Sequence, residues 1–98
     1  MLHIVNKSPF ECSSLASCLR VAQDGAVVLL IEDAVYAASR SSEAALLRDS
    51  GKKVRFYALR PDIDARGMQE RIAEGVECVD YAGFVDLVVS HESVQSWL

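Results

Sequence analysis

Three cysteines and two histidines are the side chains of this sequence best suited to nucleophilic or proton-transfer chemistry. They are Cys12, Cys18, Cys78, His3 and His91. A Cys–His pair would need a histidine beside the thiol, but His3 opens an edge of the expected sheet and His91 follows the last expected helix. We therefore expect both histidines to be structural or solvated. Three thiols with no CxxC pair are an odd set for an exported disulfide framework or a zinc site, which predicts reduced thiols and no metal.

Cys18 has the most specific surroundings of the three thiols. It lies on the margin of an apolar stripe of the expected first helix, with Leu15, Leu19 and Ala22. From the residues alone, a small buried hydrophobe is the favoured role. A reactive thiol requires partial exposure, and Arg20 and Lys7 are the available sources of positive charge that would lower its pKa.

The other two thiols offer less. Cys12 and Cys18 are six residues apart, which on a continuous helix separates them by about 9 Å along the axis and excludes a disulfide between them. Cys78 lies inside the apolar run from Val76 to Val79, where packing is favoured over reactivity.

Short apolar runs alternate with amphipathic stretches along the chain. Strands are predicted over Leu2 to Val5, Ala26 to Ile31, Lys53 to Leu59 and Val76 to Val79. Four helices are predicted: Glu11 to Gln23, a second one from Asp33 to Asp49, Pro61 to Gly67, and Asp80 to Val89. The second is expected to break at Ser39 to Ser42 and to resume at Glu43. The fourth is expected to turn Tyr81, Phe84, Val85 and Val88 inward. This alternation predicts one α/β domain over residues 1–98, with a mainly parallel four- to five-stranded sheet between helices.

Polar residues follow the strands at the carboxyl edge, the edge of the sheet where parallel strands end. They are Asn6 to Ser8, Glu32 and Asp33, Arg60 to Asp62, and Asp80. Asp62 and Arg66 are four residues apart, which predicts a surface ion pair between them. Open parallel sheets bind ligands at this edge. Ordinary helix caps are the favoured interpretation of these residues, and a binding or interface edge is the alternative.

Composition excludes several classes of function. A net charge of −4 argues against a broad surface for nucleic acid, and the sequence contains none of the motifs GxGxxG, GxxxxGK[ST], GxSxG and HExxH. We expect no cofactor. No apolar run is long enough to span a bilayer, and the start lacks the features of a signal peptide, so a cytoplasmic protein is expected. A core this small favours association with other subunits.

Four blocks in order and spacing resemble the DsrH/TusB family of sulfur-relay proteins. They are Met1 to His3 with Asn6 to Phe10; Leu29 to Asp33 with Val35 to Ala38; Tyr57 to Leu59 with Asp62 and Ala65 to Gly67; and Val79 to Leu87 with Gln95 to Leu98. The resemblance covers nearly the whole chain. One departure is Ala34, which stands where relatives often have glycine.

The resemblance implies a three-layer α/β subunit of a heterohexamer with DsrE/TusD-like and DsrF/TusC-like partners, which carries sulfur as protein persulfide and exchanges it with other carrier proteins. In the DsrH branch, tied to sulfur oxidation, the first helix holds a cysteine that the TusB branch, tied to thiolation of the tRNA wobble uridine, generally lacks. Cys18 matches that position and is the candidate persulfide carrier, in a role at most that of a transferase subunit. A purely structural subunit and a stand-alone homo-oligomer are the alternatives.

Aromatic residues near the end of the sequence are interpreted as anchors for packing or an interface. They are Tyr81, Phe84 and Trp97. Trp97 would be exposed unless it docks on the domain or on a neighbour, so loss of Gln95 to Leu98 is expected to weaken assembly.

Overall fold

Five parallel strands form the sheet of this protein. The computed structural model describes residues 1–49 and 51–97. The strands are β1 (Leu2–Val5), β2 (Val27–Leu30), β3 (Arg55–Leu59), β4 (Val76–Val79) and β5 (Val94–Trp97), in the order β4-β3-β2-β1-β5. The predicted α/β class and the four predicted strands are confirmed, and β5 is a fifth strand that the pattern had not located.

The helices also follow the prediction, with shifted ends. They are α1 (Ser14–Val21), the 3₁₀ helix η1 (Glu32–Ala38), α2 (Ser42–Arg48), α3 (Arg60–Ala65) and α4 (Tyr81–Ser90). The predicted break over Ser39 to Ser42 separates η1 from α2, and the Ser41 side chain caps α2 by accepting from the Ala44 N–H. The first helix begins three residues later than predicted, because the Ser8 carbonyl accepts from Glu11 and Cys12 in a preceding turn.

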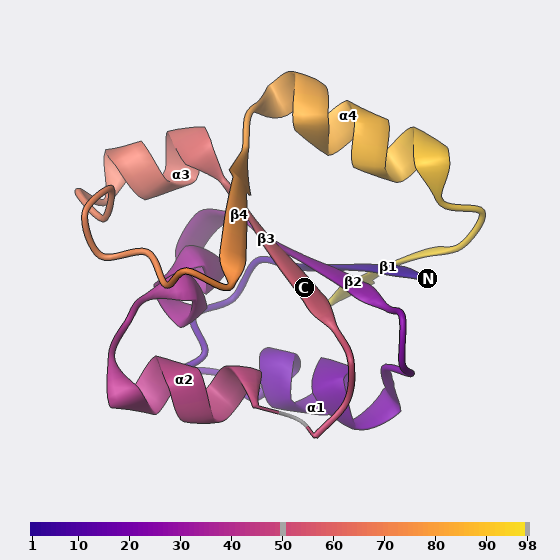
Figure 1. The fold of residues 1–98 in the computed structure, drawn as a ribbon, viewed down its shortest axis with the longest axis horizontal. Coiled ribbons are helices and arrows are strands. Elements are labelled where there is room, and N and C mark those ends of the chain that lie inside the picture. The colour runs from indigo at the N-terminus through magenta and orange to yellow at the C-terminus, as the bar shows by residue number, and fades with distance from the viewer. Residues whose placement is uncertain (50, 98) are drawn as a thin grey trace.

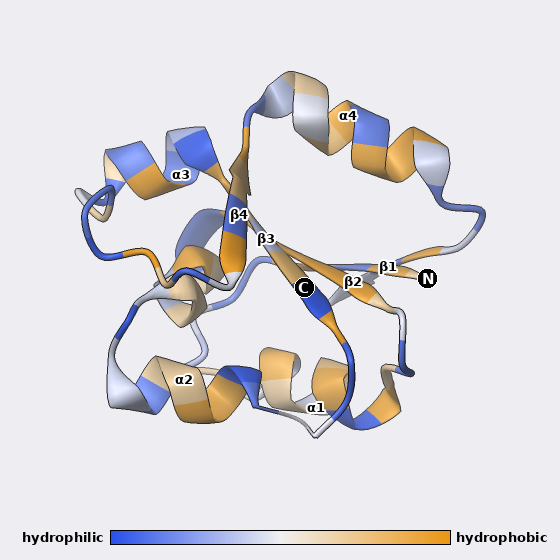
Figure 2. Cartoon of the chain, in the orientation of Figure 1, coloured by the Kyte–Doolittle hydropathy of each residue, from blue (hydrophilic) through white to orange (hydrophobic). Residues whose placement is uncertain are grey.

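The helices cover the two faces of the sheet unequally. Figure 1 shows α1 and α2 on one side and α4 on the other. The larger core cluster contains buried residues of α1, η1 and α3, and the smaller one joins β1, β2 and β3 to α4. The strands between these layers are mostly apolar in Figure 2. A strand covered on both faces is expected to be apolar throughout, as β1 and β2 largely are.

Helix α4 is turned from the predicted orientation. Phe84 and Val88 pack on the smaller core cluster as predicted, and Leu87 joins them. Tyr81 and Val85 were predicted to face inward, which is wrong: both are exposed. Gly83 allows the first turn of α4 to approach β4 closely, because a Cβ there would lie 2.9 Å from the Val79 Cβ.

Strand β5 is tied to β1 by its side chains as well as by its backbone. The Trp97 Nε1–H donates to His3 Nδ1 at 3.1 Å, and the Trp97 ring packs against the larger core cluster. Trp97 therefore docks on its own domain. His3 is 2% exposed, and burial, followed by the charge of the N-terminal amine, lowers its pKa below 6.5. An acceptor at Nδ1 requires the neutral imidazole with its proton on Nε2.

We expect this histidine to make the protein less stable in mild acid. The unfolded chain takes up the proton first, so the contribution of neutral His3 is complete above about pH 6.5 and is lost as the pH falls from there toward the lower folded-state pKa. Urea unfolding at a series of pH values measures the effect. His3→Gln is the matched control, because it keeps an acceptor for Trp97 but does not titrate; an equal loss of stability in both proteins would contradict the assignment to His3.

Candidate functional site

The structure places Cys18, the predicted carrier thiol, inside the core. Its side chain is 0% exposed and lies in the larger core cluster with Leu15 and Val28. Burial raises its pKa to about 11, and neither Arg20 nor Lys7 opposes this rise. Only about one such thiol in ten thousand is ionised at pH 7. Because the thiolate is the nucleophile in sulfur exchange, this burial disfavours reaction at Cys18 in the folded chain taken alone.

The remaining thiols lie in different surroundings. Cys12 is exposed in the turn before α1, and Cys78 is half-buried in β4 against the larger core cluster. Among the described residues, no hydrogen bond joins a cysteine to a histidine: His3 accepts from Trp97, and the ring of His91 contacts the Leu87 carbonyl at 2.7 Å. Across residues 1–49 and 51–97 there is also no group of three His, Cys, Asp or Glu placed to hold a metal.

The carboxyl edge holds a polar network that joins three of the four predicted segments. Asn6 Nδ2 donates to Glu32 Oε2 at 3.1 Å, and the Glu32 N–H donates to Asp62 Oδ2 at 2.7 Å. Arg66 binds Asp33 at 2.9 Å and lies 3.8 Å from Asp62, which confirms the predicted Asp62–Arg66 pair. The fourth segment is separate.

Asp80 in that segment caps α4, where its side chain accepts from the Gly83 N–H at 2.8 Å. That role agrees with the interpretation of these polar residues as caps.

The network stabilises the backbone turn at Glu32, between β2 and η1. Its φ of +50° is unusual for a residue with a Cβ, and Asp62 stabilises the strained turn into η1 through the Glu32 N–H. Ala34, the departure from the resemblance, has no positive φ and is buried in the larger core cluster, so the turn does not require glycine there. The Asn6 Oδ1 atom is buried with no hydrogen-bond partner in the described part of the chain.

We expect Asp62→Ala to lower the free energy of unfolding by about 1 to 2 kcal/mol, since it leaves the Glu32 N–H without its acceptor and removes the carboxylate 3.8 Å from Arg66, which keeps its pair with Asp33. Chemical denaturation followed by circular dichroism measures the loss. Asp64→Ala is the matched control, because Asp64 is an exposed residue of the same helix. A similar loss in both variants would mean that helix α3, rather than the turn at Glu32, is being weakened.

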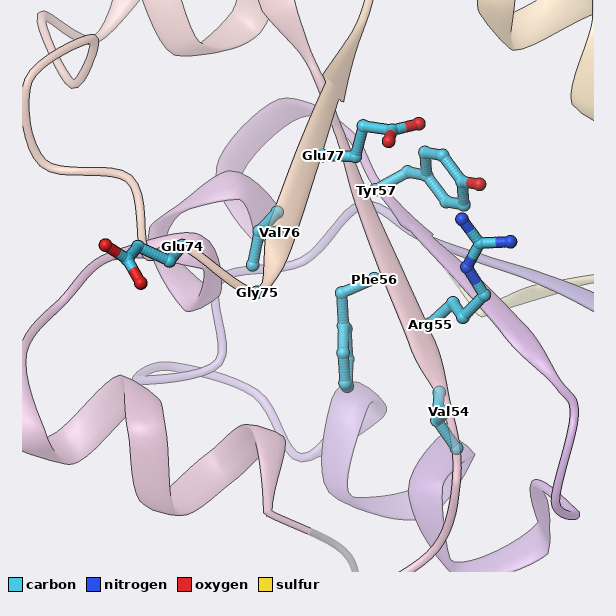
Figure 3. Close-up of a pocket in the computed structure, with 8 residues that line it drawn as sticks. All are labelled: Val54, Arg55, Phe56, Tyr57, Glu74, Gly75, Val76 and Glu77. Atoms are coloured by element: carbon cyan, nitrogen blue, oxygen red, sulfur yellow. The ribbon is translucent and has the colours of Figure 1, made fainter.

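A hollow of about 340 Å³ at the amino ends of β3 and β4 lies away from this network. Figure 3 shows Arg55, Tyr57 and Glu77 on one side of the strands, and Phe56 and Val76 on the other. The Arg55 guanidinium lies 5.5 Å from the centre of the Tyr57 ring, a cation–π contact. The lining carries charges of both signs and contains no cysteine, so this hollow offers no thiol for sulfur exchange.

Comparison with known proteins shows the family of this chain, which the geometry of the site does not. The family model described as "DsrH like protein" matches residues 7–94. Protein TusB of Pectobacterium parmentieri is 37% identical over 97 residues, which cover 99% of this chain and 100% of that protein. The chain belongs to the DsrH-like family. Protein TusB of Escherichia coli O81 is 39% identical over 100 residues, with the same coverage, so the resemblance to the DsrH/TusB family is confirmed.

Solved structures confirm the fold of this DsrH-like chain. The ychN protein of E. coli superposes with a TM-score of 0.80 at 21% identity, over 97% of each chain. The protein MTH1491 of Methanobacterium thermoautotrophicum gives a TM-score of 0.71 at 22% identity, over 97% of this chain and 95% of that one. At such identities the likeness concerns the fold alone. In the described residues, no helix is both long and apolar enough to cross a bilayer.

Proposed function

We propose that this chain is a TusB-type subunit of a cytoplasmic sulfur-relay complex that handles sulfur as protein persulfide. The observation that carries the proposal is identity of 37–39% over 99% of the chain to proteins named TusB. The partners are DsrE/TusD-like and DsrF/TusC-like subunits in a heterohexamer, which the complex links to other sulfur-carrier proteins. Those names favour thiolation of the tRNA wobble uridine over sulfur oxidation as the pathway served.

The burial of Cys18 supports a subunit that completes the assembly rather than one that carries sulfur. A persulfide relay requires a thiolate that reaches the outer sulfur of its donor. The Cys18 side chain is 0% exposed, and its pKa is raised to about 11, so it meets neither condition in the subunit alone. Cys18 acts here as a small apolar residue that packs α1 on the sheet.

Transfer through Cys18, with a role in sulfur oxidation, is the second candidate. The observation that favours it is a cysteine in the first helix at the position that the resemblance associates with the DsrH branch. This candidate requires the partner subunits to expose the thiol, for example by moving α1 off the sheet. The two candidates therefore differ in what happens to Cys18 within the complex.

A loading experiment on the assembled complex separates the two candidates. The chain is coexpressed with DsrE/TusD-like and DsrF/TusC-like subunits, incubated with a persulfide-loaded sulfurtransferase, and mapped by non-reducing peptide mass spectrometry. We expect the chain to copurify with both partners, Cys18 to gain no sulfur, and the Cys18→Ala complex to transfer sulfur at the rate of the unmodified complex. Sulfur on Cys18, with loss of transfer in Cys18→Ala but not in Cys12→Ser, would establish the second candidate. Failure to copurify would contradict the assembly itself.

A further inference from the structure

A pocket on the η1–α2 side of the protein gathers positive charge that the proposed function does not use. Its volume is about 330 Å³, at the lower end of the range of small-molecule sites, and three of its eight lining residues are Arg40, Arg66 and Arg71. The other five include Phe10 and Tyr36 and contain no carboxylate. Three of the chain's ten basic residues thus line one hollow of a protein whose net charge is −4.

Two of these arginines carry charge that is not neutralised by an ion pair. Arg66 is bound by Asp33 and Asp62, whereas no ion pair of Arg40 or Arg71 with a carboxylate occurs among residues 1–49 and 51–97. Arg40 uses one N–H of its guanidinium on the Glu70 carbonyl, which leaves its other donors for a ligand. Guanidinium groups bind phosphate through paired N–H donors.

Backbone contacts join the two segments that carry Arg40 and Arg71. The Arg40 N–H donates to the Arg71 carbonyl at 2.8 Å, and an antiparallel bridge joins Ser39 to Ile72. Arg48 of α2 donates to the Ala37 and Ser39 carbonyls at 2.6 and 2.8 Å, which fixes the chain between η1 and α2. These contacts fix the backbone of both segments, so ordering on binding is confined to side chains.

Hydroxyl groups and aromatic rings complete the lining. The hydroxyl oxygens of Ser39 and Ser41 lie 3.0 Å apart, so one hydroxyl proton is used between them and the other is free for a ligand oxygen. Phe10 and Tyr36 are large rings that remain 51% and 37% exposed. Exposed rings beside positive charge are the combination on which nucleotide bases stack while their phosphates are bound.

We propose that this pocket binds a nucleoside monophosphate. Arg40 and Arg71 bind the phosphate, the free hydroxyl of the Ser39–Ser41 pair donates to a ligand oxygen, and Phe10 and Tyr36 stack on the base. The phosphate and the base both contribute, so neither inorganic phosphate nor a nucleoside alone binds as tightly. The site lies within this chain and requires no partner subunit. A result that contradicts the proposed function therefore does not contradict this site, and the reverse also holds.

Isothermal titration of the full-length chain with AMP, adenosine and inorganic phosphate tests the site. We expect AMP to bind at least about tenfold more tightly than either fragment, because a charge-assisted phosphate contact and a stacked base each account for about that factor. A five-residue oligoadenylate tells whether the site takes a free nucleotide or a nucleotide within a strand. Binding of the oligoadenylate as tight as that of AMP indicates a free nucleotide, and binding at least about tenfold tighter indicates a nucleotide within a strand. No binding of AMP, or binding of adenosine as tight as that of AMP, would overturn the proposal.

Substitutions assign the binding to this pocket. Arg71→Gln removes a charge from an exposed side chain and is expected to weaken AMP binding at least about tenfold, and Phe10→Ala should weaken AMP while leaving phosphate unchanged. Arg55→Gln is the matched control, because it removes the same charge from the other face of the sheet, where Arg55 lies over Tyr57. Equal weakening by Arg71→Gln and Arg55→Gln would show a general charge effect and overturn the site.

Discussion

In the folded chain, Cys18 is expected to react with iodoacetamide at neutral pH at least about a hundredfold more slowly than Cys12. A rise of its pKa from 9.0 to about 11 lowers the thiolate fraction by about that factor, and exclusion of the reagent from the core adds to it. Quenching at intervals and counting labelled peptides by mass spectrometry measures both rates in one sample.

The same chain supplies the control. Cys12 is exposed, so it reports the reactivity of the reagent in each sample, and unfolding in guanidinium should bring the two rates together. Labelling of Cys18 in the folded state at the rate of Cys12 would mean that α1 leaves the sheet readily. It would also give strong support to persulfide transfer through Cys18.

Trp97→Ala is expected to lower the free energy of unfolding by about 3 kcal/mol, which for a domain of this size corresponds to a fall in Tm of roughly 15 °C. The substitution removes an aromatic ring from the larger core cluster and leaves His3, which is buried, without its hydrogen-bond donor. Calorimetry or urea denaturation measures the loss.

Gln95→Ala is the matched control for Trp97→Ala. Gln95 lies on the same strand and pairs with His3 in the register of β1 and β5, but its side chain is exposed. We expect it to change stability by less than about 0.5 kcal/mol. If both variants cost the same, the strand backbone rather than the Trp97 ring holds β5. If Trp97→Ala is the costlier variant, a loss of assembly after removal of Gln95 to Leu98 reflects a weakened fold as well as a lost contact. Leu98 lies outside the described residues.

Most of the fold was predictable because it depends on local patterns. The buried strands β1 and β2 are short apolar runs, and the break before α2 lies at a serine cluster in which Ser41 supplies the cap. Strand β5 was missed because Val94–Trp97 places two polar residues between two apolar ones, which is neither the alternation of a half-buried strand nor the apolar run of a buried one. Its position depends on pairing with β1, almost the whole chain away.

The candidate site was less predictable, because it depends on contacts distant in sequence. The apolar stripe of the first helix indicated that Cys18 is packed, whereas the family resemblance indicated a working thiol, and only the packing of α1 against the sheet shows how completely the side chain is buried. The pocket lined by Arg40 and Arg71 was missed altogether. A cluster of arginines beside exposed rings appears only once the η1–α2 connection and the segment after α3 lie side by side.

The position of β1 between β2 and β5 has a consequence for synthesis on the ribosome. A nascent chain that already contains β1 to β4 still leaves one side of β1 unpaired until Val94–Trp97 has emerged from the exit tunnel. During that interval, the open backbone of β1 is a template for pairing with other chains. Pulse-labelled cells should therefore contain a short-lived, protease-sensitive form of this protein that disappears as β5 pairs with β1.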